Sequence, residues 1–139
     1  DDDGAPEHLE MADSTITYSF IGPSVAPEYH DEYTIVVTNG TATLSRGSYG
    51  VVDGSTEPAQ TRTAPVDDAA WQHLVSGLAS LTDDEGPGGC TGGSTFAVTA
   101  ASREHVVESV SAYACGENYD RVAEVYRAFI APVAAGFDL

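Results

Sequence analysis

The sequence predicts an α+β domain: an antiparallel sheet of hairpins with two amphipathic helices packed on one face. Three observations predict this fold class. Most segments alternate apolar and polar residues, which is typical of half-buried strands. Two segments repeat apolar residues at steps of three and four, which is typical of helices. Short turns separate consecutive strand segments and therefore favour antiparallel pairing.

The length of 139 residues fits one domain. We expect this domain to span residues 14–139. Residues 1–13 are acidic and begin with three aspartates, so we expect them to form a disordered leader or tether.

Four strands are expected in the first half of the chain. Residues 15–21 alternate, with Ile16, Tyr18 and Phe20 on one side. Residues 33–38 and 41–46 flank Asn39-Gly40, the strongest short signal for a two-residue hairpin turn. This turn would pair Thr38 with Thr41, Val37 with Ala42 and Ile35 with Leu44. Residues 60–64 read as an edge strand, because Pro65 follows.

Two helices are expected, each with one apolar stripe. Asp67 can cap the first, whose stripe is Trp71, Leu74, Val75, Leu78 and Leu81. Asn118 can cap the second, whose stripe is Val122, Val125, Tyr126, Phe129, Ile130 and Val133, and Pro132 should kink or end it. Because each helix has one apolar side, both should cover the same sheet face. The other face would be rich in threonine and serine, and solvated unless something binds it.

Two cysteines flank the last expected hairpin, formed by residues 94–101 and 104–114. If Ser102-Arg103 is the turn, Val98 opposes Val107, and the same register brings Cys90 opposite Cys115. We therefore predict a Cys90–Cys115 disulfide, which implies an exported protein. The alternative is two unrelated buried thiols.

The charge balance excludes several classes of function. There are five Lys+Arg, all of them arginine, against 22 Asp+Glu, and the net charge is −17. Such a chain repels nucleic acid and anionic membranes. Without lysine there is no Schiff-base nucleophile and no phosphate-loop lysine. The acid excess fits either a solvated surface or an anionic face for a cationic partner or calcium. No apolar run is long enough for a transmembrane segment.

No motif identifies a catalytic, cofactor-binding or metal-ligating residue. His30-Asp31-Glu32 offers a base or ligands, but a polar entry to a strand explains it as well. Asp83-Asp84-Glu85 offers oxygens for calcium without the spacing of a known calcium loop. The glycine-rich stretch 86–93 lacks the lysine of a phosphate loop, and a strand follows it. We interpret these glycines as letting the backbone turn closely around the bridge.

A resemblance rests on Gly89-Cys90-Thr91-Gly92-Gly93, on Ala112-Tyr113-Ala114-Cys115 and on Trp71-Gln72-His73-Leu74. With these motifs, residues 30–133 resemble small exported bacterial lipoproteins, actinobacterial-like and of uncharacterised function. The resemblance implies an extracellular or envelope location and a disulfide, and it carries no catalytic residue. The lipid-bearing cysteine of such proteins is absent here, which leaves lipid anchoring open.

We therefore expect a non-enzymatic exported or cell-surface domain, a monomer without cofactor that binds a protein or another envelope component. Two alternatives stay open. One is a secreted protease inhibitor that presents the loop 47–58. The other is a small hydrolase with a spatially assembled acid/base site, which predicts a deep pocket with a perturbed histidine or carboxylate.

Overall fold

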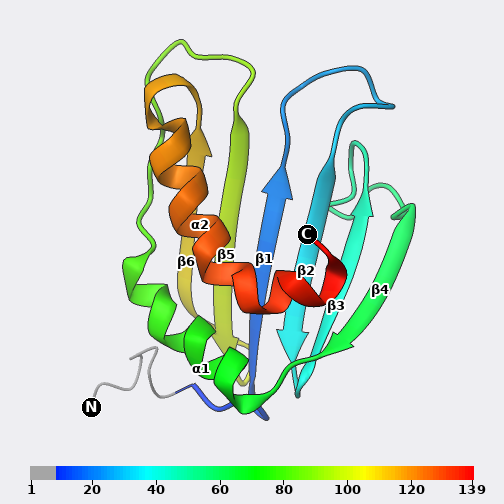
Figure 1. Ribbon diagram of the computed structural model, residues 1–139, viewed down its shortest axis with the longest axis vertical. Helices are drawn as coiled ribbons and strands as arrows, with labels where there is room; N and C mark the ends of the chain where they lie inside the picture. Colours follow the sequence, from blue (N-terminus) through cyan, green and yellow to red (C-terminus); the bar gives the residue numbers. More distant parts are fainter. Residues whose placement is uncertain (1–8) are drawn as a thin grey trace.

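The computed structural model describes residues 9–139 and contains one six-stranded antiparallel sheet with the strand order β4-β3-β2-β1-β5-β6 (Figure 1). The strands are β1 (Ser14–Ile21), β2 (Glu32–Thr38), β3 (Thr41–Gly47), β4 (Gln60–Pro65), β5 (Ser94–Ser102) and β6 (His105–Ala114). The helices are α1 (Asp68–Gly77) and α2 (Tyr119–Ala134), and the short 3₁₀ turns are η2 (Leu78–Ser80), η3 (Gly116–Asn118) and η4 (Ala135–Phe137). As expected from Pro65, β4 lies at an edge.

Both helices lie on the same face of the sheet, which confirms the predicted α+β fold (Figure 1). Between them and the sheet lies the core, to which β1 contributes Ile16 and Tyr18, and α1 contributes Trp71. The predicted helix stripes are buried except for Val125, which is 36% exposed. Asp67 caps α1 as predicted, because its carboxylate accepts a hydrogen bond from the Ala70 N–H at 2.9 Å. Within residues 9–139, no helix has the length and hydropathy needed to cross a membrane.

The β2–β3 hairpin has the register that the sequence predicts. Thr38 opposes Thr41, and Ile35 opposes Leu44. Asn39 and Gly40 form the turn with φ of 52° and 80°. Positive φ at both central residues gives the turn the twist of the flanking strands.

The predicted β5–β6 register is wrong. The turn consists of Arg103 and Glu104, with φ of 52° and 71°, and not of Ser102-Arg103. A register shift between Ala100 and Ala101 moves the pairing by a further residue, so that Val98 opposes Val110. The turn residues carry no Asn-Gly signal, and contacts elsewhere hold them: the Arg103 N–H donates to the Asp13 carbonyl at 2.9 Å.

Residues 9–13, which we expected to lie in the leader, pack against the domain. Leu9 is buried, and its carbonyl accepts a hydrogen bond from the Trp71 indole at 3.3 Å. The Met11 carbonyl accepts one from the Asn39 N–H at 3.3 Å. Two apolar side chains within an acidic stretch were the available signal for this packing. The rest of the expected leader, residues 1–8, lies outside the described residues.

Pro132 lies inside α2 and does not end it. Because proline has no N–H, the Ala128 carbonyl loses its partner four residues later in the helix. His73 of α1 replaces that partner, since its Nε2 lies 3.0 Å from the Ala128 oxygen. The imidazole therefore donates from Nε2 and links the two helices at the proline.

We expect His73→Ala to destabilise the protein by about 1 kcal/mol, because the Ala128 carbonyl then has neither a helical nor a side-chain donor. Chemical denaturation measures this change. In a Pro132→Ala background, residue 132 regains an N–H, so the cost of His73→Ala should shrink. Equal costs in the two backgrounds would show that the hydrogen bond does not matter.

Candidate functional site

The face of the sheet opposite the helices is lined by hydroxyl and small apolar side chains, and we name it the hydroxyl face. Its register positions follow from the pairing of the strands and the burial of the alternate residues. They are Thr15, Thr17, Ser19, Ile21, Thr34, Val36, Thr38, Thr41, Thr43, Ser45, Thr61, Thr63, Thr95, Ala97, Thr99, Ala101, Val106, Ser109, Ser111 and Tyr113.

None of these positions carries a charge, although charged residues make up 19% of the chain. One row crosses all six strands and consists of Thr63, Thr43, Val36, Thr17, Thr99 and Ser109. Glu32 has the same orientation in β2, but it is buried. In a chain with a net charge of −17, an uncharged face of this extent needs an explanation beyond solubility, because a solvated surface would tolerate carboxylates.

The loop 48–59 folds over one end of the hydroxyl face and leaves a hollow of about 660 Å³ beneath it. Thr17, Thr34, Val36 and Ser45 form the floor, and residues from Val51 to Pro58 form the overhang. Val51 is buried and anchors the loop. The Tyr49 hydroxyl donates to the Val25 carbonyl at 2.6 Å, and the Ser48 hydroxyl donates to the Pro27 carbonyl at 2.7 Å. These contacts hold the loop in place before any partner arrives.

A buried pair, His30 and Glu32, joins this loop to the sheet. His30 Nδ1 lies 2.7 Å from the Pro23 carbonyl oxygen, and Nε2 lies 2.8 Å from Glu32 Oε2. The other Glu32 oxygen accepts the Val52 N–H at 3.2 Å. The Tyr49 ring stacks on the imidazole at 3.6 Å and covers it. Because a carbonyl oxygen only accepts, Nδ1 donates to Pro23, and one shared proton links Nε2 to Glu32 Oε2.

This geometry bears on the alternatives to a binding module. Neither nitrogen of His30 is free to accept a proton, so the His30-Asp31-Glu32 segment is a structural strand entry and not a base. Asp31 binds Arg46 in a bidentate pair at 2.9 Å. The loop expected to serve a protease inhibitor forms successive turns against the sheet instead of an extended segment. Neither alternative gains support from these contacts.

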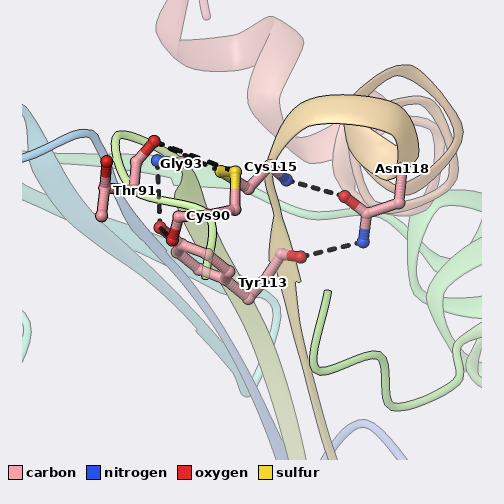
Figure 2. Close-up of a disulfide and its surroundings, with 6 residues drawn as sticks. All are labelled: Cys90, Thr91, Gly93, Tyr113, Cys115 and Asn118. Carbon is pink, nitrogen blue, oxygen red and sulfur yellow. Dashed lines mark hydrogen bonds between the residues drawn. A yellow bond between two sulfur atoms is a disulfide. The ribbon is translucent and has the colours of Figure 1, made fainter. Parts of the chain in front are cut away.

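The predicted Cys90–Cys115 disulfide is present, with 6.3 Å between the two α-carbons (Figure 2). We had expected Cys90 to lie opposite Cys115 in the strand ladder, but it does not. The register continued from Ser94 and Ala114 places Gly93 opposite Cys115. The segment from Cys90 to Gly93 turns back toward the end of β6 instead. A Cβ on Gly93 would lie 2.6 Å from the Cβ of Cys115, so only glycine allows this approach.

Polar side chains lock the strand ends around the disulfide, as Figure 2 shows. The Gly93 N–H donates to the Tyr113 hydroxyl at 3.1 Å. Asn118 accepts from the Cys115 N–H at 2.7 Å and donates to the Tyr113 carbonyl at 2.9 Å. We had expected the Asn118 side chain to cap α2, but it makes no cap hydrogen bond. It connects the end of β6 to the start of the helix instead.

The acidic segment Asp83-Asp84-Glu85 covers the free edge of β6. The Asp84 N–H donates to the Ser111 carbonyl at 3.2 Å, and the Tyr113 N–H donates to the Asp84 carbonyl at 2.8 Å. The Gly86 N–H, together with Asn118 and Arg121, holds the pKa of the Asp84 carboxyl below its usual range. Across residues 9–139, no group of three or more His, Cys, Asp or Glu side chains is arranged to hold a metal ion.

Comparison of the chain with protein-family models and with curated proteins found no match.

Proposed function

We propose that this chain is a non-enzymatic binding module of an exported or cell-surface protein, and that the hydroxyl face is its binding surface. A disulfide is typical of proteins in oxidising compartments, which supports the extracellular or envelope location. The resemblance to small exported bacterial lipoproteins supports the same location. The absence of charge across the hydroxyl face is the observation that carries the binding role.

Protein interfaces differ from the remaining surface chiefly because their centres are depleted of charged residues while their rims are polar. The hydroxyl face has this composition. Its centre is neutral, whereas Asp53 and Glu57 lie in the overhanging loop and Asp13 lies just before β1. A partner with a flat, neutral centre and basic side chains around it would complement this pattern.

The dimensions of the face predict a reversible contact. Strands about 4.8 Å apart and side chains about 6.7 Å apart along each strand give the face an area of about 600 Å². A standard interface buries about 800 Å² on each partner. The sheet face therefore reaches this size only together with the loop 48–59. Because this loop is already held in place, binding loses little conformational entropy in ordering it.

A photo-crosslinking amino acid at Thr43 or Thr99 tests this proposal, with the same residue at Gln72 of α1 as the matched exposed control. The protein is exposed to intact cells and medium of its source. We expect both face positions to capture the same partner and Gln72 to capture none. Unlabelled wild-type protein should compete, whereas the variant Thr43→Arg/Thr99→Arg should compete at least tenfold less well, because two buried unpaired charges oppose docking.

The variant Gln72→Arg is the control for added charge and should compete like the wild type. Thermal unfolding of all variants checks that they fold. Capture from Gln72 as strongly as from Thr43 and Thr99, or undiminished competition by the folded double-arginine variant, would contradict the proposal.

A further inference from the structure

A second surface lies on the opposite side of the sheet, beside α2. The row above the core places Arg46, Tyr33, Phe20 and Phe96 next to one another on β3, β2, β1 and β5. The centre of the Phe20 ring lies 5.3 Å from the centre of the Tyr33 ring and 5.2 Å from the centre of the Phe96 ring. Figure 1 shows that α2 crosses the sheet diagonally and leaves the adjacent ends of β1, β2 and β3 without a helix above them. Phe20 and Tyr33 are consequently only half-buried.

Arg127 extends from α2 to the border of this aromatic shelf. Its guanidinium carbon lies 5.9 Å from the centre of the Phe96 ring, and one of its nitrogens donates to the Tyr119 hydroxyl at 3.3 Å. Its charge opposes the effect of burial, which raises the pKa of Tyr33.

Arg127 lacks a carboxylate partner among residues 9–139, which is unexpected where acids outnumber arginines fourfold. Arg46, Arg103 and Arg121 pair with Asp31, Asp13 and Asp84, respectively. Arg62 has no carboxylate partner among these residues either, but it donates to the Phe137 carbonyl at 3.2 Å. Arg127 is exposed and bonded only to a neutral hydroxyl, so most of its five donors are free to bind an anion in a fork.

The core beneath the shelf contains a further unused polar group. Tyr18 is fully buried, and its hydroxyl has no hydrogen-bond partner among the described residues. Its ring centre lies 6.2 Å from that of Tyr33. The shelf therefore combines a guanidinium without a carboxylate partner and two accessible rings, and the Tyr18 hydroxyl lies in the core beneath them.

We propose that this aromatic shelf binds the C-terminal end of a peptide or protein whose last residue is aromatic. The terminal carboxylate would pair with Arg127, and the side-chain ring would lie on Phe20 and Tyr33. A carboxylate complements the uncompensated charge, and a ring complements the half-buried aromatics.

Titration with the peptide Gly-Ser-Gly-Phe tests this site, with its C-terminal amide as the matched ligand. Aromatic and arginine side-chain NMR signals report the position of binding. We expect the acid to shift the signals of Phe20, Tyr33 and Arg127 and to bind about tenfold more tightly than the amide, which cannot accept a charge-assisted fork. Arg127→Gln should remove this preference, and Arg103→Gln should leave it unchanged.

N-acetylphenylalanine in the same titration tests whether a small aromatic acid binds as well as a peptide that ends in the same residue. We expect it to bind more weakly than the peptide. Equal affinity for acid and amide would overturn the proposal, as would signal shifts confined to other regions. Because Arg127→Gln removes the contact to Tyr119, the thermal midpoint of this variant is measured as well, to check that it folds. The acid-to-amide comparison on the wild type decides the question even if this variant unfolds. Binding at the hydroxyl face is independent of either outcome.

Discussion

His30→Phe is expected to lower the free energy of unfolding by about 3 kcal/mol, because it leaves the Glu32 carboxyl group buried without its hydrogen-bond partner. The Glu32 side chain is 8% exposed, and the His30 side chain is 1% exposed. Phenylalanine retains the stacking on Tyr49 but offers no proton to Glu32 or to the Pro23 carbonyl. Urea denaturation of the two proteins measures the difference.

The double variant His30→Phe/Glu32→Gln is the control for this prediction. Glutamine keeps an oxygen for the Val52 N–H but carries no charge, so the double variant should be more stable than His30→Phe alone. The same comparison should show faster hydrogen exchange at Val52 in the single variant, because the loop 48–59 loses its anchor. A double variant less stable than the single one would show that the unpartnered Glu32 carboxyl group is not the cause of the loss.

Replacing both cysteines with serine is expected to destabilise the protein by about 3 kcal/mol. The disulfide closes a segment with a sequence separation of 25 residues, and the chain-entropy relation gives about this value for such a loop. For a domain of this size the thermal midpoint should fall by roughly 10 °C. Differential scanning calorimetry measures both quantities.

Reduction of the wild-type protein provides the matched comparison. Dithiothreitol should lower the midpoint of the wild type to that of the Cys90→Ser/Cys115→Ser variant and should leave the variant unchanged. A midpoint insensitive to reduction would mean that the bridge contributes nothing to stability.

The strands and helices could be predicted from the sequence wherever local chemistry agrees with the fold. Asn39-Gly40 determines its own hairpin register, and Asp67 caps its own helix. The β5–β6 register could not be predicted, because Arg103 and Glu104 adopt positive φ in a turn that is held by Asp13, a residue distant in sequence. The disulfide was predicted correctly from a wrong register, since the segment from Cys90 to Gly93 makes up the three residues by which the pairing differs.

The candidate sites show a similar division. The alternation of threonine and serine predicted a polar outer face, because period-two patterns survive any consistent register. The sequence could not show that one uncharged row would cross all six strands, since this depends on five separate pairings. Nor could it show that Arg127 would lack a carboxylate partner, or that His30 would be buried between Pro23 and Glu32. These features arise from contacts between residues far apart in the chain.

The most direct test of the hydroxyl face follows threonine methyl signals by NMR while the crosslinked partner is added. The threonine methyls of Thr17, Thr34, Thr43 and Thr99 lie on this face and should shift or broaden at substoichiometric partner. Valine methyls of α2, such as those of Val125, should remain unchanged. Shifts at Val125 with unchanged threonine methyls would contradict the assignment of the binding surface to the outer face of the sheet.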